Sequence, residues 1–328
     1  ECRGNMRIGL VYNPNSGKQE KDLDLMKALA KKFEKFHLFC TKSTHLHLKE
    51  YFNLEVTGSG TIHNDYRDTI NAGNALSKMN LVISIGGDGT ASDVVAGMRL
   101  TGRLAPVAGV ALGTANCGPL IVFRSAADIL DFDFLNIEPK WVTGLDVFEE
   151  DYISSAFNDV VISETLISTV EGKNLTIDAS NFFYRNERTP REPVSIASET
   201  SRLEINGEEV SPHFRTSQII ISPFSKDTKG LFAYKAVSGL LCWLPYSSCN
   251  SAMIVSSRPI ITMVEPGETV SAEIKQFILT NSDTVSLSGF EAFCVIDGNP
   301  RVDLSASKGI KVKINGRAGL GVKRRDEE

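Results

Sequence analysis

The sequence has no apolar run long enough to cross a membrane and no excess of basic residues. A membrane-spanning helix needs about 18 or more consecutive apolar residues, and no stretch approaches that length. The 40 acidic residues outnumber the 35 basic ones, giving a net charge of -5, the wrong sign for a protein that mainly binds nucleic acid. The first residues also lack the apolar core of a signal peptide. We therefore expect a cytoplasmic protein that binds neither nucleic acid nor membranes.

Cysteine is scarce and scattered along the chain. The six cysteines include no C-x-x-C pair, which argues against a zinc site and against a disulfide framework. We expect buried thiols and no structural metal. With 42% hydrophobic and 23% charged residues the chain has the composition of an ordinary folded protein. At about 100 to 200 residues per domain, its 328 residues predict two domains.

The first third of the chain alternates short apolar runs with helical patterns. Apolar runs at Arg7–Tyr12, Leu81–Ile85 and Pro106–Leu112 predict buried strands, and apolar residues spaced three and four apart predict a helix over residues 21–36. Because the runs are continuous rather than alternating, they favour a Rossmann-like parallel sheet with helices on both faces. Ligands of such α/β sheets bind beyond the carboxyl ends of the strands.

The pattern changes after about residue 135, where helical periodicity fades and short strand patterns follow. The segments Gly144–Phe148 and Tyr152–Ser163 predict a hairpin around Glu149-Glu150-Asp151. Turns at Asn206–Gly207 and Asp297–Gly298 are likewise typical of an antiparallel β domain. Residues 180–198 have no period and predict a surface loop. The predicted divisions are an α/β nucleotide-binding domain at 1–135, a β-rich substrate domain at 136–307 and a C-terminal segment at 308–328 that can return to the first domain.

The sequence Gly86-Gly87-Asp88-Gly89-Thr90 follows one predicted strand and opens a predicted helix. The glycines allow a phosphate to approach backbone N–H groups, and the helix N-terminus adds positive potential. A carboxylate here would repel a phosphate unless it meets a metal ion or accepts a proton from a hydroxyl, and both occur in phosphoryl transfer. The alternative is an ordinary glycine turn in which Asp88 caps the helix.

This G-G-D-G-T sequence resembles the signature shared by NAD kinases and the diacylglycerol and sphingosine lipid kinases. Asn13-Pro14-Asn15-Ser16-Gly17-Lys18 is similar to the N-P-x-S-G loop of that superfamily, and Gly113-Thr114-Ala115-Asn116 to its G-T-x-N element. The resemblance implies that Asp88 is catalytic, accepting the hydroxyl proton, holding Mg²⁺ or another divalent cation, or both. It implies that the donor phosphates are bound by Asn13, Ser16, Lys18, Gly86, Gly87, Gly89, Thr90, Gly113, Thr114 and Asn116.

Two later segments bear on the branch of the superfamily. The N-terminal loop favours the lipid kinases, whereas Ala156-Phe157-Asn158-Asp159-Val160-Val161-Ile162 resembles the N-E/D region of NAD kinases. That resemblance implies that Asn158 and Asp159 hydrogen-bond a dinucleotide, with Asp159 toward the ribose hydroxyls or the adenine amino group. A partial match at Gly230–Tyr234 implies substrate contacts from Ala233 and Tyr234, although Leu231 and Phe232 replace the hydroxyl residues of the motif.

The resemblance therefore implies an NAD kinase that uses ATP or polyphosphate to phosphorylate the 2′-hydroxyl of NAD. Folds of this family have two domains with the active site in the cleft between them, and its members are commonly homo-oligomers. Two alternatives stay open. A lipid kinase would need an apolar acceptor channel, which the apolar residues of 231–244 could line. A nucleotide-binding sensor with a decayed site would explain the hydroxyls lost at Leu231 and Phe232.

Overall fold

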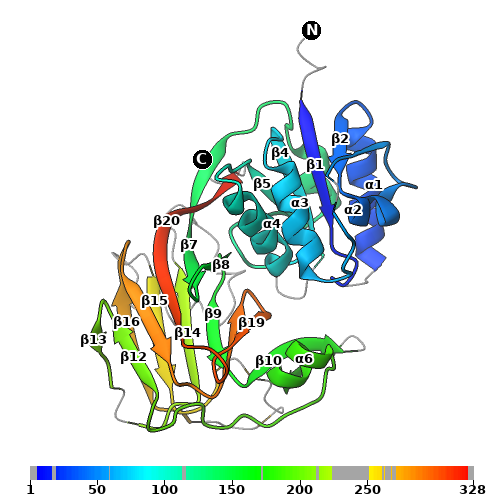
Figure 1. Ribbon diagram of the computed structural model, residues 1–328. Coiled ribbons are helices and arrows are strands. Elements are labelled where there is room, and N and C mark those ends of the chain that lie inside the picture. The colour runs from blue at the N-terminus through cyan, green and yellow to red at the C-terminus, as the bar shows by residue number, and fades with distance from the viewer. Residues whose placement is uncertain are drawn as a thin grey trace. The chain divides into compact units, whose positions relative to one another are not determined.

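The chain folds into two compact units in the computed structural model (Figure 1). The structure describes residues 6–16, 20–58, 60–112, 116–170, 173–211, 214–223, 251–260, 262, 267 and 271–323. The first unit holds the described residues up to Val142 and those from Gly319 onward, and the second holds the described residues between Thr143 and Ala318. Two long strands, β7 (Pro139–Phe148) and β20 (Ile310–Val322), carry the chain across these boundaries.

The first unit is built on a parallel sheet with the strand order β3-β2-β1-β4-β5, in which β6 and Gly321 of β20 also pair with β5. Its strands are β1 (Arg7–Tyr12), β2 (His37–Cys40), β3 (Leu54–Val56), β4 (Leu81–Gly86), β5 (Val107–Ala111) and β6 (Ile121–Phe123). Its helices are α1 (Glu20–Phe33), α2 (Lys42–Leu48), α3 (Tyr66–Leu76), α4 (Asp88–Leu100) and α5 (Ala126–Asp131). The predicted α/β sheet is confirmed.

The two faces of this sheet pack against different helices. Ile8 of β1 lies in a buried core with Leu29 and Phe33 of α1. The next residue, Gly9, points to the other face, where an added Cβ atom would lie 3.1 Å from Cδ1 of Leu76 in α3. Because successive strand residues face opposite sides, continuous apolar strands require covering on both. Helices α3 and α4 lie side by side (Figure 1).

Helices α3 and α4 approach closely because each presents a glycine to the other. A Cβ atom on Gly73 would overlap the backbone carbonyl oxygen of Val94, and one on Gly97 would overlap that of Ile70. Backbone atoms cannot swing away as a flexible side chain can, so both positions require glycine. This contact holds α4 against the sheet with its first turn at the carboxyl ends of the strands.

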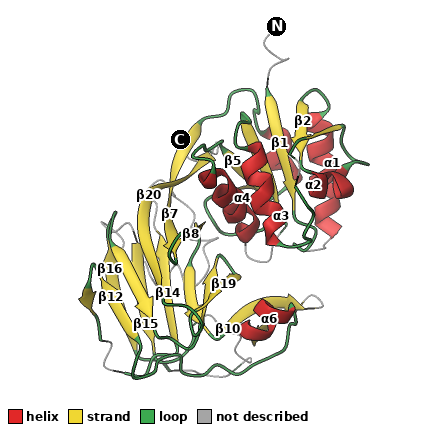
Figure 2. Ribbon diagram, viewed as in Figure 1, coloured by secondary structure: helices red, strands yellow, loops and turns green. Residues whose placement is uncertain are grey.

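The second unit consists mainly of antiparallel strands, with helix α6 (Ala179–Arg185) beside them (Figure 2). One sheet has the strand order β16-β15-β14-β9-β18-β19, a second group joins β13, β12, β17 and β20, and β7 pairs with β8. The remaining strands are β8 (Tyr152–Ala156), β9 (Val160–Ser163), β10 (Thr165–Val170), β11 (Lys173–Asp178), β12 (Arg202–Ile205), β13 (Glu208–Glu209), β14 (Gln218–Pro223), β15 (Ser251–Ser256), β16 (Ile274–Leu279), β17 (Thr284–Ser288), β18 (Phe293–Ile296) and β19 (Asn299–Asp303). The predicted antiparallel domain is confirmed.

The six-stranded sheet is buried on both faces. Ile219 and Ile221 of β14 lie in one core with Leu287 of β17, whereas Ile220 between them lies in a second core with Ile177 of β11. The hairpin β10–β11 and helix α6 belong to this second layer. The sheet therefore forms the middle of the unit.

The residue types at one hairpin turn and at one helix start explain the local structure found there. Asn206–Gly207 has φ values of 54° and 84°, and both residues of a type I′ hairpin need positive φ. The loop predicted at 180–198 is wrong at its start, because α6 occupies residues 179–185. The Asp178 carboxylate caps this helix by accepting the Asn181 N–H at 2.8 Å. Two turns are too short to show a helical period in the sequence.

Among the helices of the described ranges, none has the length and apolarity that a membrane span requires.

Candidate functional site

Three loops with unusual sequences follow the adjacent strands β1, β4 and β5 at the same edge of the parallel sheet. The backbone N–H of Asn13 donates to the Ile85 carbonyl at 3.1 Å, and its Nδ2 donates to Oγ1 of Thr90 at 3.0 Å. The Ser16 hydroxyl donates to the Asn13 carbonyl at 2.7 Å. The structure thus brings Asn13, Ser16 and Thr90 together. Lys18, Gly113 and Thr114 lie outside the described residues.

The glycines of the second loop leave room for this contact. A Cβ atom on Gly86 would overlap the Thr90 side chain, whose residue is only 4% exposed. Gly87 is the N-cap of α4, and Gly89 is buried in its first turn. The 13-residue helix therefore begins at the sheet edge, where its first N–H groups and its dipole favour an anion.

Asp88 joins this loop to the one after β5. Its Oδ2 accepts the backbone N–H of Cys117 at 3.0 Å, and its Oδ1 accepts that of Gly118 at 2.8 Å. The alternative interpretation of Asp88 as the helix cap is wrong, because Gly87 is the N-cap and Asp88 is the first helical residue. The carboxylate instead fixes a loop 29 residues further along the chain. The sequence held no signal for these two partners.

Arg124 brings a cation to the same edge, and the sequence reasoning missed it. Its Nη2 donates to the carbonyl of Asn116 at 3.4 Å. Asn116 itself has a φ of 51°, a left-handed conformation in which asparagine is among the favoured residues. The available signal was an arginine directly after the apolar run of β6, which places its side chain beyond a carboxyl end.

In the second unit, Asn158 and Asp159 lie in the break between β8 and β9. The hairpin predicted around Glu149-Glu150-Asp151 is confirmed by the pairing of β7 with β8. Its second strand was predicted to run on to Ser163, which is wrong, because β9 pairs with β14 and β18 instead. The chain therefore changes partners at residues 157–159. Such a change leaves several consecutive backbone groups without sheet partners, so another group must satisfy them.

The carboxylate of Asp297 accepts hydrogen bonds from the backbone N–H groups of this break. Its Oδ2 accepts the N–H of Phe157 at 2.8 Å, and its Oδ1 accepts those of Asn158 and Asp159 at 2.8 and 3.0 Å. In return the Asp297 N–H donates to the Asp159 carbonyl at 3.0 Å. The sequence identified Asp297 only as part of a hairpin turn.

The amide side chain of Asn158 takes no part in holding this turn. Its backbone carbonyl accepts the Ser222 hydroxyl at 2.8 Å, and the Ser222 carbonyl in turn accepts the Ser251 hydroxyl at 2.6 Å. In the described part of the chain, Oδ1 of Asn158 is buried and has no hydrogen-bond partner. Asp159 beside it is 5% exposed. Ala233, Tyr234, Leu231 and Phe232 lie outside the described residues.

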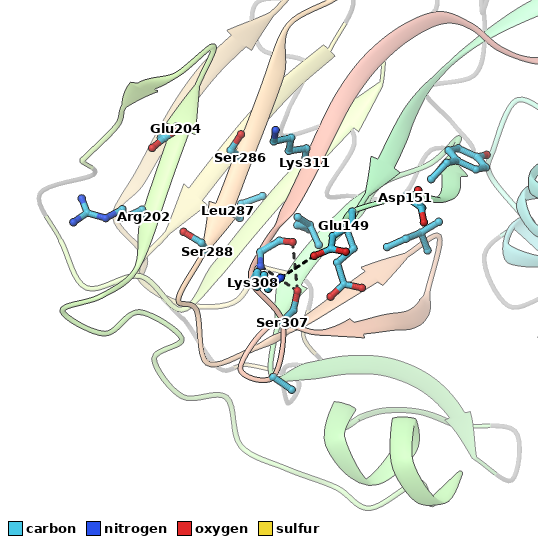
Figure 3. A pocket seen from close by; sticks show the side chains of 16 residues that line it. Glu149, Asp151, Arg202, Glu204, Ser286, Leu287, Ser288, Ser307, Lys308 and Lys311 are labelled. Carbon is cyan, nitrogen blue, oxygen red and sulfur yellow. Dashed lines mark hydrogen bonds and ion pairs between the residues drawn. The ribbon is translucent and has the colours of Figure 1, made fainter.

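A hollow of about 710 Å³ lies elsewhere in the second unit, between the β7–β8 turn and the outer face of β12, β17 and β20. Arg202 and Glu204 of β12 and Lys311 of β20 are among the residues that line it (Figure 3). Lys308 and Glu150 form an ion pair at 2.9 Å on its rim, but their side chains are 90% and 77% exposed. These mixed, exposed charges are typical of a solvated surface.

In the part of the chain that the structure describes, no three His, Cys, Asp or Glu side chains gather as a metal-binding group. Mg²⁺ needs no such cage in phosphoryl transfer, because one or two carboxylates and the substrate phosphates usually hold it. A carboxylate such as that of Asp88 is of the type that makes a direct or water-mediated contact to Mg²⁺.

Comparison with known proteins agrees with this architecture. The sequence of an uncharacterized protein of Archaeoglobus fulgidus is 26% identical over 292 residues, which span 87% of this chain and 91% of the relative. The crystal structure of yeast NADH kinase complexed with NADH has a TM-score of 0.52 at 15% identity, covering 98% of this chain and 84% of that one. A diacylglycerol kinase of Bacillus anthracis str. Sterne has a TM-score of 0.53 at 12% identity, covering 98% of both chains.

These two likenesses concern the fold. In sequence, residues 7–122 match the model of the diacylglycerol kinase catalytic domain. The match covers all three loops at the edge of the parallel sheet, including Asp88 and the residues that its carboxylate holds. Residues 7–122 thus resemble a kinase-type catalytic domain, and the chain shares its fold with an NADH kinase and a diacylglycerol kinase.

Proposed function

We propose that the protein is an NAD kinase, which transfers the terminal phosphoryl group of ATP or polyphosphate to the 2′-hydroxyl of NAD. The observation that carries this proposal is the buried Oδ1 of Asn158, which has no hydrogen-bond partner in the described part of the chain. An amide presents a donor and an acceptor side by side, and this pair complements the amino group and N7 of an adenine. The hydroxyl of a lipid acceptor offers no such edge.

The neighbouring carboxylate suits the same acceptor. Asp159 is buried beside Asn158, and an ionised carboxylate accepts hydrogen bonds from hydroxyl groups such as those of a ribose. Two adjacent residues would then hold the base and the sugar of one nucleotide. We include Ala233 and Tyr234 as further substrate contacts on the partial motif match.

On the donor side, the edge of the parallel sheet supplies what a polyphosphate needs. Gly86, Gly87, Gly89 and Thr90 bring backbone N–H groups and the start of α4, and Asn13, Ser16, Lys18, Gly113, Thr114 and Asn116 complete the proposed donor site. The Asn13–Thr90 bond keeps two of these loops in register. Fixed donors of this kind stabilise charge that develops during transfer without reorganising.

Asp88 has two roles in this proposal. By accepting the N–H groups of Cys117 and Gly118 it fixes the backbone at these two residues. In the reaction the carboxylate would accept the proton of the attacking hydroxyl or bind Mg²⁺. The cation, when bound with the donor, neutralises charge on the phosphates.

A lipid alcohol is the second candidate acceptor. The specific observation in its favour is that residues 7–122 match the diacylglycerol kinase catalytic domain. That match lies in the first unit and covers the proposed donor site, whereas Asn158 and Asp159 lie beyond it. The acceptor is therefore argued from the second unit, where the amide favours a nucleotide.

A product assay separates the two acceptors. The protein is incubated with Mg²⁺ and γ-labelled ATP or polyphosphate, together with either NAD or vesicles that contain diacylglycerol, and the labelled product is identified. We expect label in NADP, with Asp88→Asn as the blank. Label only in the lipid would transfer the proposal to the second candidate, and label in neither would leave a nucleotide-binding protein without kinase activity.

A further inference from the structure

We infer that Asp297 is a positioning residue of the acceptor site: its carboxylate shapes the turn at residues 157–159 so that the Asn158 amide is left for the ligand. The inference rests on the proposed function, because it takes Asn158 as the residue that reads the acceptor. It adds a residue 138 positions away from Asp159 to that site.

The first argument is the convergence of three consecutive N–H groups on one carboxylate. The N–H groups of Phe157, Asn158 and Asp159 all donate to Asp297, at distances between 2.8 and 3.0 Å. Successive N–H groups that point to one spot form a concavity that suits an anion. Here the anion is part of the chain, so the turn is fixed before any ligand arrives.

The second argument is how firmly Asp297 is itself held. Asp297 and Gly298 have φ values of 45° and 83° and form the tip of the β18–β19 hairpin. Strand β18 pairs with β9, and Ile296 lies opposite Val160, the first residue after the turn. The hairpin tip and the turn are therefore adjacent by sheet register. Asp297 is 8% exposed, and its hydrogen bonds to charged oxygen offset the cost of burying the carboxylate.

The third argument is that the turn at residues 157–159 is held without the side chain of Asn158. Asparagine in a turn commonly bonds its side chain to nearby backbone N–H groups. Asp297 already holds those N–H groups, and Ser222 holds the Asn158 carbonyl. The amide of Asn158 is thus released from the structural role that it would otherwise take. Asp297 acts on the ligand through Asn158 and needs no contact with it.

Replacing the Asp297 carboxylate by an amide would break at least one of the hydrogen bonds that hold the turn. Asparagine at position 297 has a single acceptor oxygen, and its NH₂ group would face at least one backbone N–H of the turn. We expect Asp297→Asn to raise the KM for NAD by tenfold or more and to leave the KM for ATP within twofold. Amide hydrogen exchange at residues 157–159 should become faster.

Asp283→Asn is the matched control. The Asp283 carboxylate also holds a turn in the second unit, accepting the Thr280 N–H at 2.6 Å and the Asn206 amide at 2.9 Å. We expect this variant to keep the KM for NAD within twofold. An equal rise in both variants, or no rise in Asp297→Asn, would overturn the positioning role. If Asp297→Asn does not fold, Asp297→Glu keeps the charge, and it should raise the same KM.

A double-mutant cycle distinguishes positioning from general support of the fold. Since Asp297 acts through Asn158, Asp297→Asn should add little to the KM for NAD in an Asn158→Ala background. Independent, multiplicative effects would overturn the inference. If the wild type does not phosphorylate NAD, the proposed acceptor fails. The comparison is then made by amide exchange at residues 157–159, where an Asp297→Asn protein equal to wild type would overturn the positioning role.

Discussion

Oδ1 of Asp88 lies 2.8 Å from the backbone nitrogen of Gly118, and the glycine allows that approach. A Cβ atom at position 118 would lie 2.7 Å from the same oxygen. The carboxylate of the G-G-D-G-T sequence is therefore held by a residue outside the G-T-x-N sequence. This contact joins the loops after β4 and β5 in one arrangement.

The variant Gly118→Ala tests whether this arrangement matters for catalysis. The added methyl group would displace the Asp88 carboxylate without removing it, so we expect kcat to fall by about ten- to a hundredfold, as for small misplacements of reacting groups. Steady-state kinetics and circular dichroism measure activity and fold. Gly60→Ala is the control, because an added Cβ atom there meets nothing closer than 3.9 Å. A Gly118→Ala enzyme with wild-type kcat would remove Asp88 positioning from the account.

The bond between Asn13 and Thr90 should act on the donor rather than the acceptor. Asn13→Ala removes the 3.0 Å side-chain bond, so we expect the KM for ATP to rise about fivefold and the KM for NAD to stay unchanged. The free energy of unfolding should fall by about 1 kcal/mol, as for a lost hydrogen bond. Asn15→Ala, at the exposed neighbour in the same loop, should leave both KM values unchanged. Equal changes in the two KM values would argue against a separate donor loop.

Burial should protect two thiols from alkylation. Burial raises the pKa of Cys40 to about 11 and that of Cys294 to about 12. Because the thiolate is the reactive form, both should remain unlabelled by iodoacetamide at pH 8 and react after unfolding in urea. Raising the pH should speed labelling of Cys40 before that of Cys294. Peptide mass spectrometry gives the labelled sites, and rapid native labelling of either thiol would contradict its burial.

The contact between α3 and α4 predicts an effect on stability. Gly97→Ala would push a Cβ atom into the Ile70 carbonyl oxygen, and overpacking of this kind costs about 1–3 kcal/mol or more of unfolding free energy. The intrinsic helix preference of alanine over glycine, about 1 kcal/mol, would offset only part of that loss. Urea unfolding measures the difference, with Gly60→Ala again as control. A variant as stable as wild type would show that the helices can separate slightly without cost.

The sequence predicted the elements whose signals are local. The apolar runs at β1, β4 and β5, and the glycine-rich loops after them, locate the edge of the parallel sheet because strand order places these ends together. The hairpin at Asn206–Gly207 is equally local, since its positive φ values need those residue types. Helix α6 was missed because its seven residues are too few to show a helical period, and its cap, Asp178, is not a sufficient signal alone.

The contacts that hold the site were beyond the reach of the sequence. The change of partners at residues 157–159 depends on which strands β8 and β9 pair with. No local sequence pattern indicates that pairing. Asp297 reaches that turn from 138 or more residues away, and Asp88 reaches Gly118 from 30 residues away. A side chain that binds a distant backbone group produces no periodicity or motif in the sequence. Such contacts can be predicted only once the pairing of the strands is known.

The central claim is that the Asn158 amide recognises a dinucleotide acceptor by hydrogen bonds. The most direct measurement is the rate of NADP formation from NAD, Mg²⁺ and ATP, followed with an NADP-specific dehydrogenase, in the wild type and in Asn158→Ala. The account predicts NADP formation by the wild type and a KM for NAD raised by tenfold or more in the variant, with the KM for ATP unchanged. No NADP from the wild type, or an Asn158→Ala enzyme with the wild-type KM for NAD, would contradict it.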